Sequence, residues 1–280
     1  MHFVVCLKQV PDTSEVRIDP LTNNLIREGI PSIINPYDVH ALEEALRMRD
    51  KVGGQVTIVS MGPMQAIEAL QKAMSYGADR AILLSDRAFG GSDSLATAYI
   101  LATAIENLNK TEPIDLILAG KEAIDGDTAQ TGPGIAQRLG FAQLTYVIKV
   151  RELTDASIIV ERKTEGGRMV VEAKLPALIT VEKELNDVRY ASLPNVMKAA
   201  EYMPEIWDSQ ALNFDRAKIG LKGSPTSVTR IFAPLGRSGG EIMDGTKDPA
   251  GIAAVVVERV FQQNIIMVNP VTKGENNNDR

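Results

Sequence analysis

Short β-branched runs alternate with longer stretches of helical periodicity from residue 3 to residue 147, and no other pattern limits the possible folds as strongly. Strands that alternate with helices pair in parallel, because the connection between two parallel strands needs about the length of a helix. The sequence therefore predicts an α/β fold, with a mostly parallel sheet flanked by helices. The expected strands are Phe3–Leu7, Gln55–Ser60, Arg80–Leu84, Asp115–Ala119 and Leu144–Lys149.

Helix starts are marked by turn and cap residues after these strands. Asn35 and Pro36 open the first helix, where we expect Asn35 to cap free N–H groups and Pro36 to occupy the first turn. Two more helices are expected after Gly62–Pro63 and after Ser92–Asp93. Their apolar stripes indicate that all three pack on a sheet.

One hairpin pattern lies within this region, and others follow it. Ser157–Arg162 and Arg168–Ala173 alternate polar and apolar residues, and Ala177–Val181 is a buried apolar run; we expect all three to be antiparallel additions to the same sheet. Val16–Arg27 predicts a small separate hairpin with Asp19–Pro20 at its turn.

The C-terminal third is more polar. Residues 182–225 show little periodicity, so we expect them to need another surface for packing. A short helix is expected near Ala250–Gln262, before an asparagine-rich end that is too polar to order by itself. We therefore divide the chain into an α/β domain, 1–225, and a C-terminal arm with a helix, 226–280.

Composition excludes several classes of function. With 30 basic and 36 acidic residues among 280, the net charge is −6, which argues against binding to nucleic acid or an anionic membrane. Cys6, His2 and His40 are too few for a disulfide or a structural metal site. We find neither a signal peptide nor an apolar run of about 18 residues, and so expect a reducing cytoplasm.

Familiar catalytic and phosphate-binding motifs are absent. Neither histidine has a plausible catalytic triad, and we expect Cys6 to be an inert small hydrophobic residue, so hydrolase chemistry is discarded. Gly120–Lys121 lacks the other residues of a P-loop, and Gly132-Pro133-Gly134 has Gln137 where a dinucleotide motif needs glycine.

A loop of small and hydroxyl residues, 120–133, is the strongest binding signal. It follows the strand Asp115–Ala119 and precedes a helix, which is where ligands bind in open α/β sheets. Its small residues allow backbone N–H groups to approach a phosphate. We give Asp125 and Asp127 capping or ribose-hydroxyl roles, since both would repel a phosphate; a well-capped loop without a ligand is the alternative. Together with Cys6–Pro11 and Met61–Pro63, the loop should form one adenine-sized crevice.

Four segments give the chain a family resemblance over nearly its whole length: Cys6–Asp12, Asn35–Ala45, Asp125–Pro133 and Leu185–Ala199. The chain resembles the beta subunits of electron transfer flavoproteins. The resemblance implies a sheet like that of the adenine nucleotide alpha hydrolases, paired with an alpha subunit on which the arm 226–280 packs. It also implies a heterodimer that acts as an electron carrier.

The resemblance does not decide which nucleotide the subunit binds. In the bifurcating type, FAD in this subunit takes a hydride from NADH and sends electrons separately to ferredoxin and, through the alpha-subunit FAD, to a flavin-dependent dehydrogenase of acyl-CoA or lactate type. Such a complex is an NADH-dependent, ferredoxin-reducing oxidoreductase. In the simpler type, the site holds structural AMP. A stand-alone adenine-nucleotide sensor is a third possibility.

Features that favour the bifurcating type are the segment Val160–Arg168, where the resemblance places the flavin ring, and the tail Gly223–Pro234. Arg162 or Lys163 would stabilise a reduced flavin there, or would simply be solvated hairpin charges.

The resemblance assigns nucleotide binding to the crevice loops and docking of the dehydrogenase to the loop 183–200, with Leu193 as its apolar anchor. Alternatively, Leu193 is tucked inward on a mobile connection. The docking residues are Leu193, Pro194 and Asn195. The expected nucleotide-binding residues are Cys6, Leu7, Lys8, Asn35, Asp38, Ser60, Met61, Gly62, Gly120, Lys121, Asp125, Gly126, Asp127, Thr128, Ala129, Gln130, Thr131 and Gly132.

Overall fold

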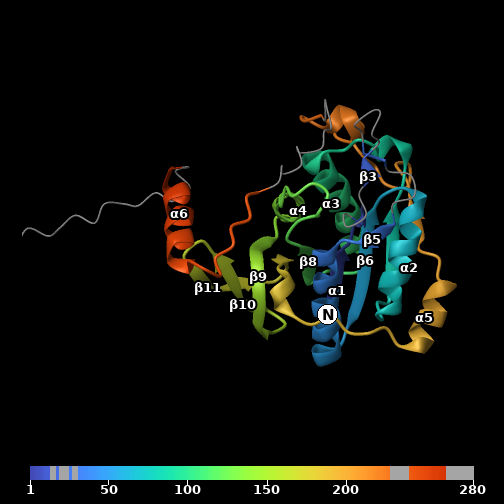
Figure 1. Ribbon diagram of the computed structural model, residues 1–280. Coiled ribbons are helices and arrows are strands. Elements are labelled where there is room, and N and C mark those ends of the chain that lie inside the picture. The colour runs from blue at the N-terminus through green and yellow to red at the C-terminus, as the bar shows by residue number, and fades with distance from the viewer. Residues whose placement is uncertain (13–16, 19–24, 27–30, 228–239, 263–280) are drawn as a thin grey trace, which may run out of the picture. The chain divides into compact units, whose positions relative to one another are not determined.

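The computed structural model of the chain describes residues 1–12, 17–18, 25–26, 31–227 and 240–262 (Figure 1). It divides into two units, Met1–Ala233 and Pro234–Arg280. In the second unit, the expected helix is present as α6 (Pro249–Gln262), in which no residue is buried. No helix in the described ranges is long and apolar enough to cross a membrane.

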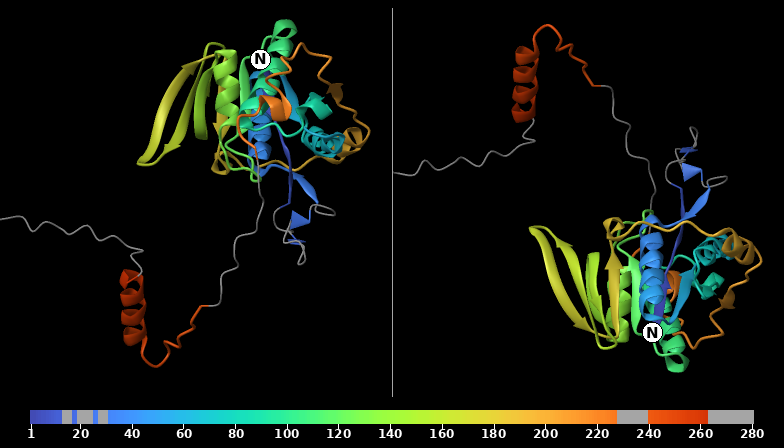
Figure 2. Two further views of the ribbon diagram at one scale, coloured as in Figure 1. Left: turned by 90° about the horizontal axis from the view of Figure 1, so that it is seen from above. Right: turned by 90° about the horizontal axis from the view of Figure 1, so that it is seen from below.

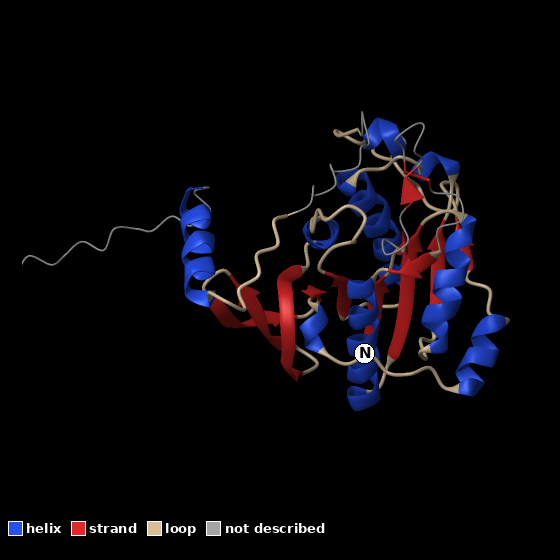
Figure 3. Ribbon diagram, in the orientation of Figure 1, coloured by secondary structure: helices blue, strands red, loops and turns tan. Residues whose placement is uncertain are grey.

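A nine-stranded sheet forms the centre of the first unit, in the order β11-β10-β9-β12-β8-β1-β6-β7-β13 (Figure 3). All five predicted strands are present, and Arg80–Leu84 has the expected bounds. The strands are β1 (His2–Cys6), β6 (Gln55–Met61), β7 (Arg80–Leu84), β8 (Leu116–Gly120), β9 (Ala142–Leu153), β10 (Ser157–Thr164), β11 (Gly167–Lys174), β12 (Ala177–Val181) and β13 (Glu205–Trp207).

The central strands β8, β1, β6 and β7 pair in parallel, as predicted. β10 pairs antiparallel with β9 and β11, so the predicted hairpin is confirmed. The prediction of an antiparallel strand at 177–181 was wrong, because β12 pairs in parallel with both β8 and β9. All five of its residues are buried, and a run that is apolar on both faces gains most from a place between two neighbours.

Helices cover both faces of the sheet. α1 (Pro36–Val52) and α2 (Ile67–Ser75) pack on one face, and α3 (Ser94–Thr111) and α4 (Thr131–Leu139) on the other. Alternate side chains of β1 serve the two cores: Phe3 and Val5 face α1 and α2, while Val4 and Cys6 face α3 and α4. The predicted helix starts are confirmed at Pro36 and after Asp93. After Pro63 a short 3₁₀ turn, η2 (Met64–Ala66), precedes α2.

The small excursions near the N-terminus form separate two-stranded sheets. β2 (Gln9–Pro11) pairs with β5 (Ser32–Ile34), and β3 (Arg17–Ile18) pairs antiparallel with β4 (Leu25–Ile26). The predicted hairpin 16–27 is thus present in its strands, while its turn at residues 19–20 lies outside the described residues.

Residues 182–225 contain more structure than their polarity predicts. They form the 3₁₀ turns η4 (Lys183–Leu185) and η5 (Gly220–Gly223), the helix α5 (Leu193–Ala200) and the edge strand β13. Gln71 on α2 donates to the carbonyl of Tyr202 at 3.0 Å, and the Tyr202 hydroxyl accepts from the Ala81 N–H at 2.9 Å. The segment therefore packs on its own domain. Sequence periodicity missed α5 because eight residues make only about two helical turns, too few for the period to be recognised.

Candidate functional site

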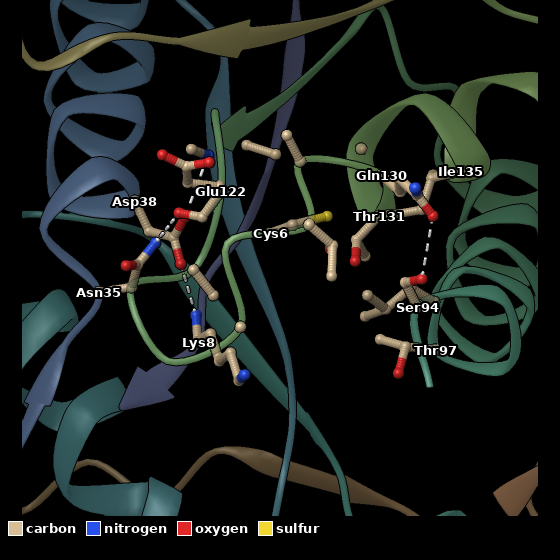
Figure 4. Close-up of a pocket in the computed structure, with 18 of the residues that line it drawn as sticks. Cys6, Lys8, Asn35, Asp38, Ser94, Thr97, Glu122, Gln130, Thr131 and Ile135 are labelled. Carbon is tan, nitrogen blue, oxygen red and sulfur yellow. Dashed lines mark hydrogen bonds between the residues drawn. The ribbon is translucent and has the colours of Figure 1, made fainter. Parts of the chain in front are cut away.

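A pocket of about 280 Å³ lies at the carboxyl edge of the parallel sheet. It is lined by the ends of β1, β6 and β8 and by the first residues of α1, α3 and α4. Figure 4 shows Lys8, Asn35 and Asp38 on one side, facing Ser94, Thr97 and Thr131 on the other. The predicted convergence of strand-end loops on one crevice is therefore present.

Asp38 ties two strand ends together on one wall of the pocket. Its Oδ2 accepts the N–H of Lys8 at 2.8 Å, and its Oδ1 accepts the N–H of Gly120 at 3.0 Å. A Cβ at Gly120 would collide with Asp38 and Tyr37, so glycine is required there. Burial raises the pKa of Asp38 to about 7, although the hydrogen bonds act in the opposite direction.

Asn35 does not cap α1 with its side chain, and that prediction was wrong. Its Nδ2 instead donates to the carbonyl of Glu122 at 2.9 Å, and its Oδ1 accepts the N–H of Ile124 at 3.2 Å. With 1% of its surface exposed, Asn35 fixes the loop after β8. The Asn35 amide has both a donor and an acceptor, so it can pair with a carbonyl and an N–H of the same loop. If the side chain capped α1 instead, both of these loop groups would lose their partner.

The lysines at the rim are neutralised by carboxylates. Lys8 Nζ lies 2.7 Å from both oxygens of Asp125. This carboxylate therefore pairs with the lysine instead of capping a helix. Lys121 pairs with Glu122 at 3.0 Å and Glu182 at 3.6 Å. Burial alone would lower the Lys121 pKa, but these two carboxylates raise it. Because both lysines are already paired, binding of an anion in the pocket depends more on backbone N–H groups than on lysine side chains.

The loop before α4 presents such N–H groups. Asp127 and Ala129 have φ values of 47° and 53°, a left-handed conformation that turns successive N–H groups toward one side. Among the described residues, none accepts a hydrogen bond from the N–H groups of residues 128–132, which include the first turn of α4. Helix starts and nests of this kind bind phosphate. The donor set therefore fits the phosphate of a nucleotide.

The start of α3 forms the opposite wall, which sequence reasoning missed. Ser92, Asp93, Ser94 and Thr97 line the pocket, and Ser94 Oγ lies 3.4 Å from Gln130 Oε1. Asp93 caps α3 by accepting the N–H groups of residues 95 and 96 at 3.0 Å. The sequence pattern at Ser92–Asp93 was interpreted only as a helix start. Because this helix also follows a predicted parallel strand, its first residues could have been placed at the same edge of the sheet.

Fifteen of the eighteen residues expected to bind the nucleotide line the pocket. Ser60, Gly62 and Asp125 do not. Ser60 is buried, and its Oγ has no hydrogen-bond partner among the described residues. The N–H of Gly62 donates to the carbonyl of Leu84. Further residues that line the pocket without having been foreseen are Val59, Leu101, Ala119, Glu122, Ala123 and Ile135.

Of the other residues singled out for their chemistry, Cys6 lines the pocket, whereas Arg162 and Lys163 do not. Burial raises the pKa of the Cys6 thiol to about 12, which leaves that pocket-lining sulfur unreactive. Arg162 donates to the carbonyl and hydroxyl of Thr145 at 3.0 and 2.7 Å, and Lys163 pairs with Glu184 at 3.4 Å.

Leu193 is 73% exposed at the first position of α5, so it is not tucked inward. Pro194 is exposed beside it, and Asn195 is half-buried. The three residues expected to dock a partner thus begin a short helix rather than occupying a loop.

Comparison with known proteins agrees with this geometry. A model of the electron transfer flavoprotein domain matches residues 22–211. Protein FixA of Azotobacter vinelandii is 48% identical over 98% of this chain and 99% of its own length. The electron transfer flavoprotein subunit beta of Clostridium acetobutylicum is 48% identical over 95% of this chain and 100% of its own. The caffeyl-CoA reductase-Etf complex subunit CarD of Acetobacterium woodii is 47% identical, over 95% of this chain and all of CarD. The chain therefore belongs to the electron transfer flavoprotein family, as one of the beta subunits that pair with an alpha subunit in electron transfer.

Proposed function

We propose that this subunit binds FAD, that a hydride from NADH is accepted at this site, and that the electrons pass separately to ferredoxin and, through the alpha-subunit FAD, to a flavin-dependent dehydrogenase. The backbone N–H groups of residues 128–132 carry the proposal, because no acceptor within the described part of the chain pairs with them and their arrangement fits the phosphates of a nucleotide. FAD, when bound, supplies both the two-electron and the one-electron chemistry.

The chain's own residues would bind and orient the nucleotide. The N–H groups of residues 128–132 would hold phosphate, and the hydroxyls of Thr128 and Thr131 would add neutral hydrogen bonds. Asp38 and Asn35 keep the two loops of the opposite wall in place. Of the two hairpin cations, we propose that Arg162 stabilises negative charge on a reduced flavin, since Thr145 fixes its guanidinium while Lys163 is already paired.

The partner follows from one relative. CarD is named as a subunit of a caffeyl-CoA reductase-Etf complex, which supports a dehydrogenase partner of acyl-CoA type for this chain. A lactate-type dehydrogenase is the alternative. We propose that this partner docks on α5, where Leu193, Val196 and Met197 are exposed at the spacing of one helix face.

The alpha subunit is proposed to cover the arm 226–280. On α6, Val256, Val257 and Phe261 are each about half exposed, at 49%, 52% and 47%. A helix with no buried residue and this much apolar surface does not persist in water without a covering surface.

A beta subunit that holds structural AMP is the second candidate. The pocket volume favours it, because about 280 Å³ lies near the lower end of the range for small-molecule sites, roughly 300–1,000 Å³. Such a volume suits the adenylate that AMP and FAD share, and leaves the rest of FAD to lie outside the pocket.

Nucleotide content separates the two candidates. The chain is co-expressed with its alpha subunit, and the nucleotides of the purified heterodimer are extracted and counted. Two FAD per heterodimer, with bleaching of the flavin colour by NADH, support bifurcation. One FAD and one AMP, without bleaching, refute it and leave an electron carrier that serves as scaffold and docking platform.

A further inference from the structure

An ion pair between a buried carboxylate and a partly exposed arginine holds the segment before α5 on α1. Glu43 on α1 has 4% of its surface exposed. Arg189 donates to it through Nε at 2.8 Å and Nη2 at 3.3 Å, each to a different carboxylate oxygen, and through its backbone N–H at 3.2 Å. Three bonds to one buried carboxylate hold this point of the chain far more firmly than a surface ion pair would.

A second fastening lies one turn earlier on α1. Asn186 Nδ2 donates to the carbonyl of His40 at 3.1 Å and to Oε2 of Glu44 at 2.9 Å, and Nδ1 of His40 lies 3.0 Å from the Asn186 carbonyl. Residues 186–189, which we call the strap, are therefore held along about one turn of the helix. Figures 1 and 2 show the yellow segment after β12 crossing α1 on its way to α5.

The strap leads directly into the exposed apolar face. Three residues after Arg189, Ser192 caps α5 by accepting the N–H of Asn195 at 3.3 Å, and Leu193 follows as the first helical residue. The other end of the segment is held separately, because the carbonyl of Tyr202 accepts a hydrogen bond from Gln71 on α2. The position at which α5 begins is thus set by the strap.

α1 also reaches the pocket. Asp38, in its first turn, lines the pocket wall, and Glu43 lies five positions further along the same helix. One rigid element therefore holds both the nucleotide pocket and the strap. We propose that Glu43 and Arg189 are positioning residues, which fix α5 relative to α1 so that the dehydrogenase can dock on its apolar face; this rests on the docking function proposed above.

The test uses the complete alpha–beta complex with Glu43→Gln, and Arg189→Lys as a second variant, since lysine keeps the charge but not the forked contact. Asp50→Asn is the matched control, because Asp50 contacts the same guanidinium at 2.9 Å but its side chain is 49% exposed. Amide hydrogen exchange of residues 186–200 measures the position of the segment. Steady-state kinetics with an acyl-CoA-type flavin dehydrogenase measures docking.

We expect exchange in residues 186–200 to accelerate about tenfold or more, and KM for the dehydrogenase to rise about tenfold, in both variants. The kcat, the nucleotide content and NADH oxidation with an artificial acceptor should stay unchanged, and Asp50→Asn should resemble the wild type.

Three results overturn the inference. Unchanged exchange and KM in both variants show that the pair does not position α5, while Leu193→Ala, measured in parallel, still reports on docking. Faster exchange with KM unchanged in the variants and in Leu193→Ala places the docking surface elsewhere, and the positioning role fails with the docking proposal. An equal fall in kcat and in artificial-acceptor activity shows general structural damage and also overturns it.

Discussion

Aspartate in place of Thr131 should empty the nucleotide pocket without weakening the fold. Thr131 is the first residue of α4, lines the pocket and lies within the run of unpaired N–H groups. No acidic residue occupies the first turn of α4. A carboxylate there would stabilise the helix by about 0.3–1 kcal/mol through the helix dipole. The same charge faces the position at which we expect a phosphate.

The expected loss of affinity follows from Coulomb's law. Two unit charges at about 5 Å and an effective dielectric constant of about 20 repel by about 3 kcal/mol. Since about 1.4 kcal/mol corresponds to a factor of ten, the nucleotide should bind at least 100-fold more weakly. Thr131→Asn is the matched control: it has the size of aspartate without the charge, and we expect a loss of less than about tenfold.

Thr131 is a cleaner position than its neighbour. A Cβ at Gly132 would lie 2.6 Å from the Thr180 side chain, so a substitution there pushes α4 away from β12. The assay is nucleotide extraction from the purified heterodimer, with thermal unfolding as the measure of the fold. Stoichiometric nucleotide in Thr131→Asp would refute the phosphate assignment. Because loss of a bound nucleotide by itself lowers Tm, a Tm below that of the nucleotide-free wild type would show that the change is structural.

Three further predictions concern docking and pH. Leu193→Ala should raise KM for the dehydrogenase about tenfold or more, since burying a leucine contributes about 1.5–3 kcal/mol, while Leu221→Ala, similarly exposed at 68%, should not; equal effects would count against docking at α5. Burial lowers the pKa of His2, so its neutral form stabilises the fold above pH 6.5 and this contribution is lost as the pH falls below that value; the urea midpoint should show the loss in the wild type but not in His2→Gln. Asp38 has the opposite sign: its raised pKa favours the fold at low pH, and that contribution is lost as the pH rises through about 7. The free energy of unfolding of the wild type relative to Asp38→Asn should therefore fall as the pH rises from the ordinary aspartate pKa of 3.8 to about 7. A flat difference between these two values would contradict the buried carboxylate.

Much of the nucleotide site could be predicted because its position follows from local patterns. Parallel strands bring their carboxyl ends to one edge, and small residues before a helix mark a phosphate-binding turn. Cys6, Met61 and the residues 126–132 were placed together on this basis, and all line the pocket. Ser60 and Gly62 were not separable from Met61 by sequence, because alternate strand residues point to opposite faces and the register was unknown.

The family segments near Leu193 likewise indicated a surface, but not a helix. α5 has only eight residues, so the apolar spacing in its sequence covers about two turns, which is too short a stretch for periodicity to distinguish a helix from a loop.

The order of residues along the chain was thus sufficient for the alternation of strands and helices, the phosphate-binding loop and the hairpin, since each depends on neighbours within a few positions. Tertiary structure alone decided what depends on distant partners: β12 between β8 and β9, Asn35 turned to the loop at Glu122, and Arg189 paired with Glu43. A buried polar group takes whichever partner the packed fold brings within hydrogen-bond distance, and that choice has no signature in local sequence.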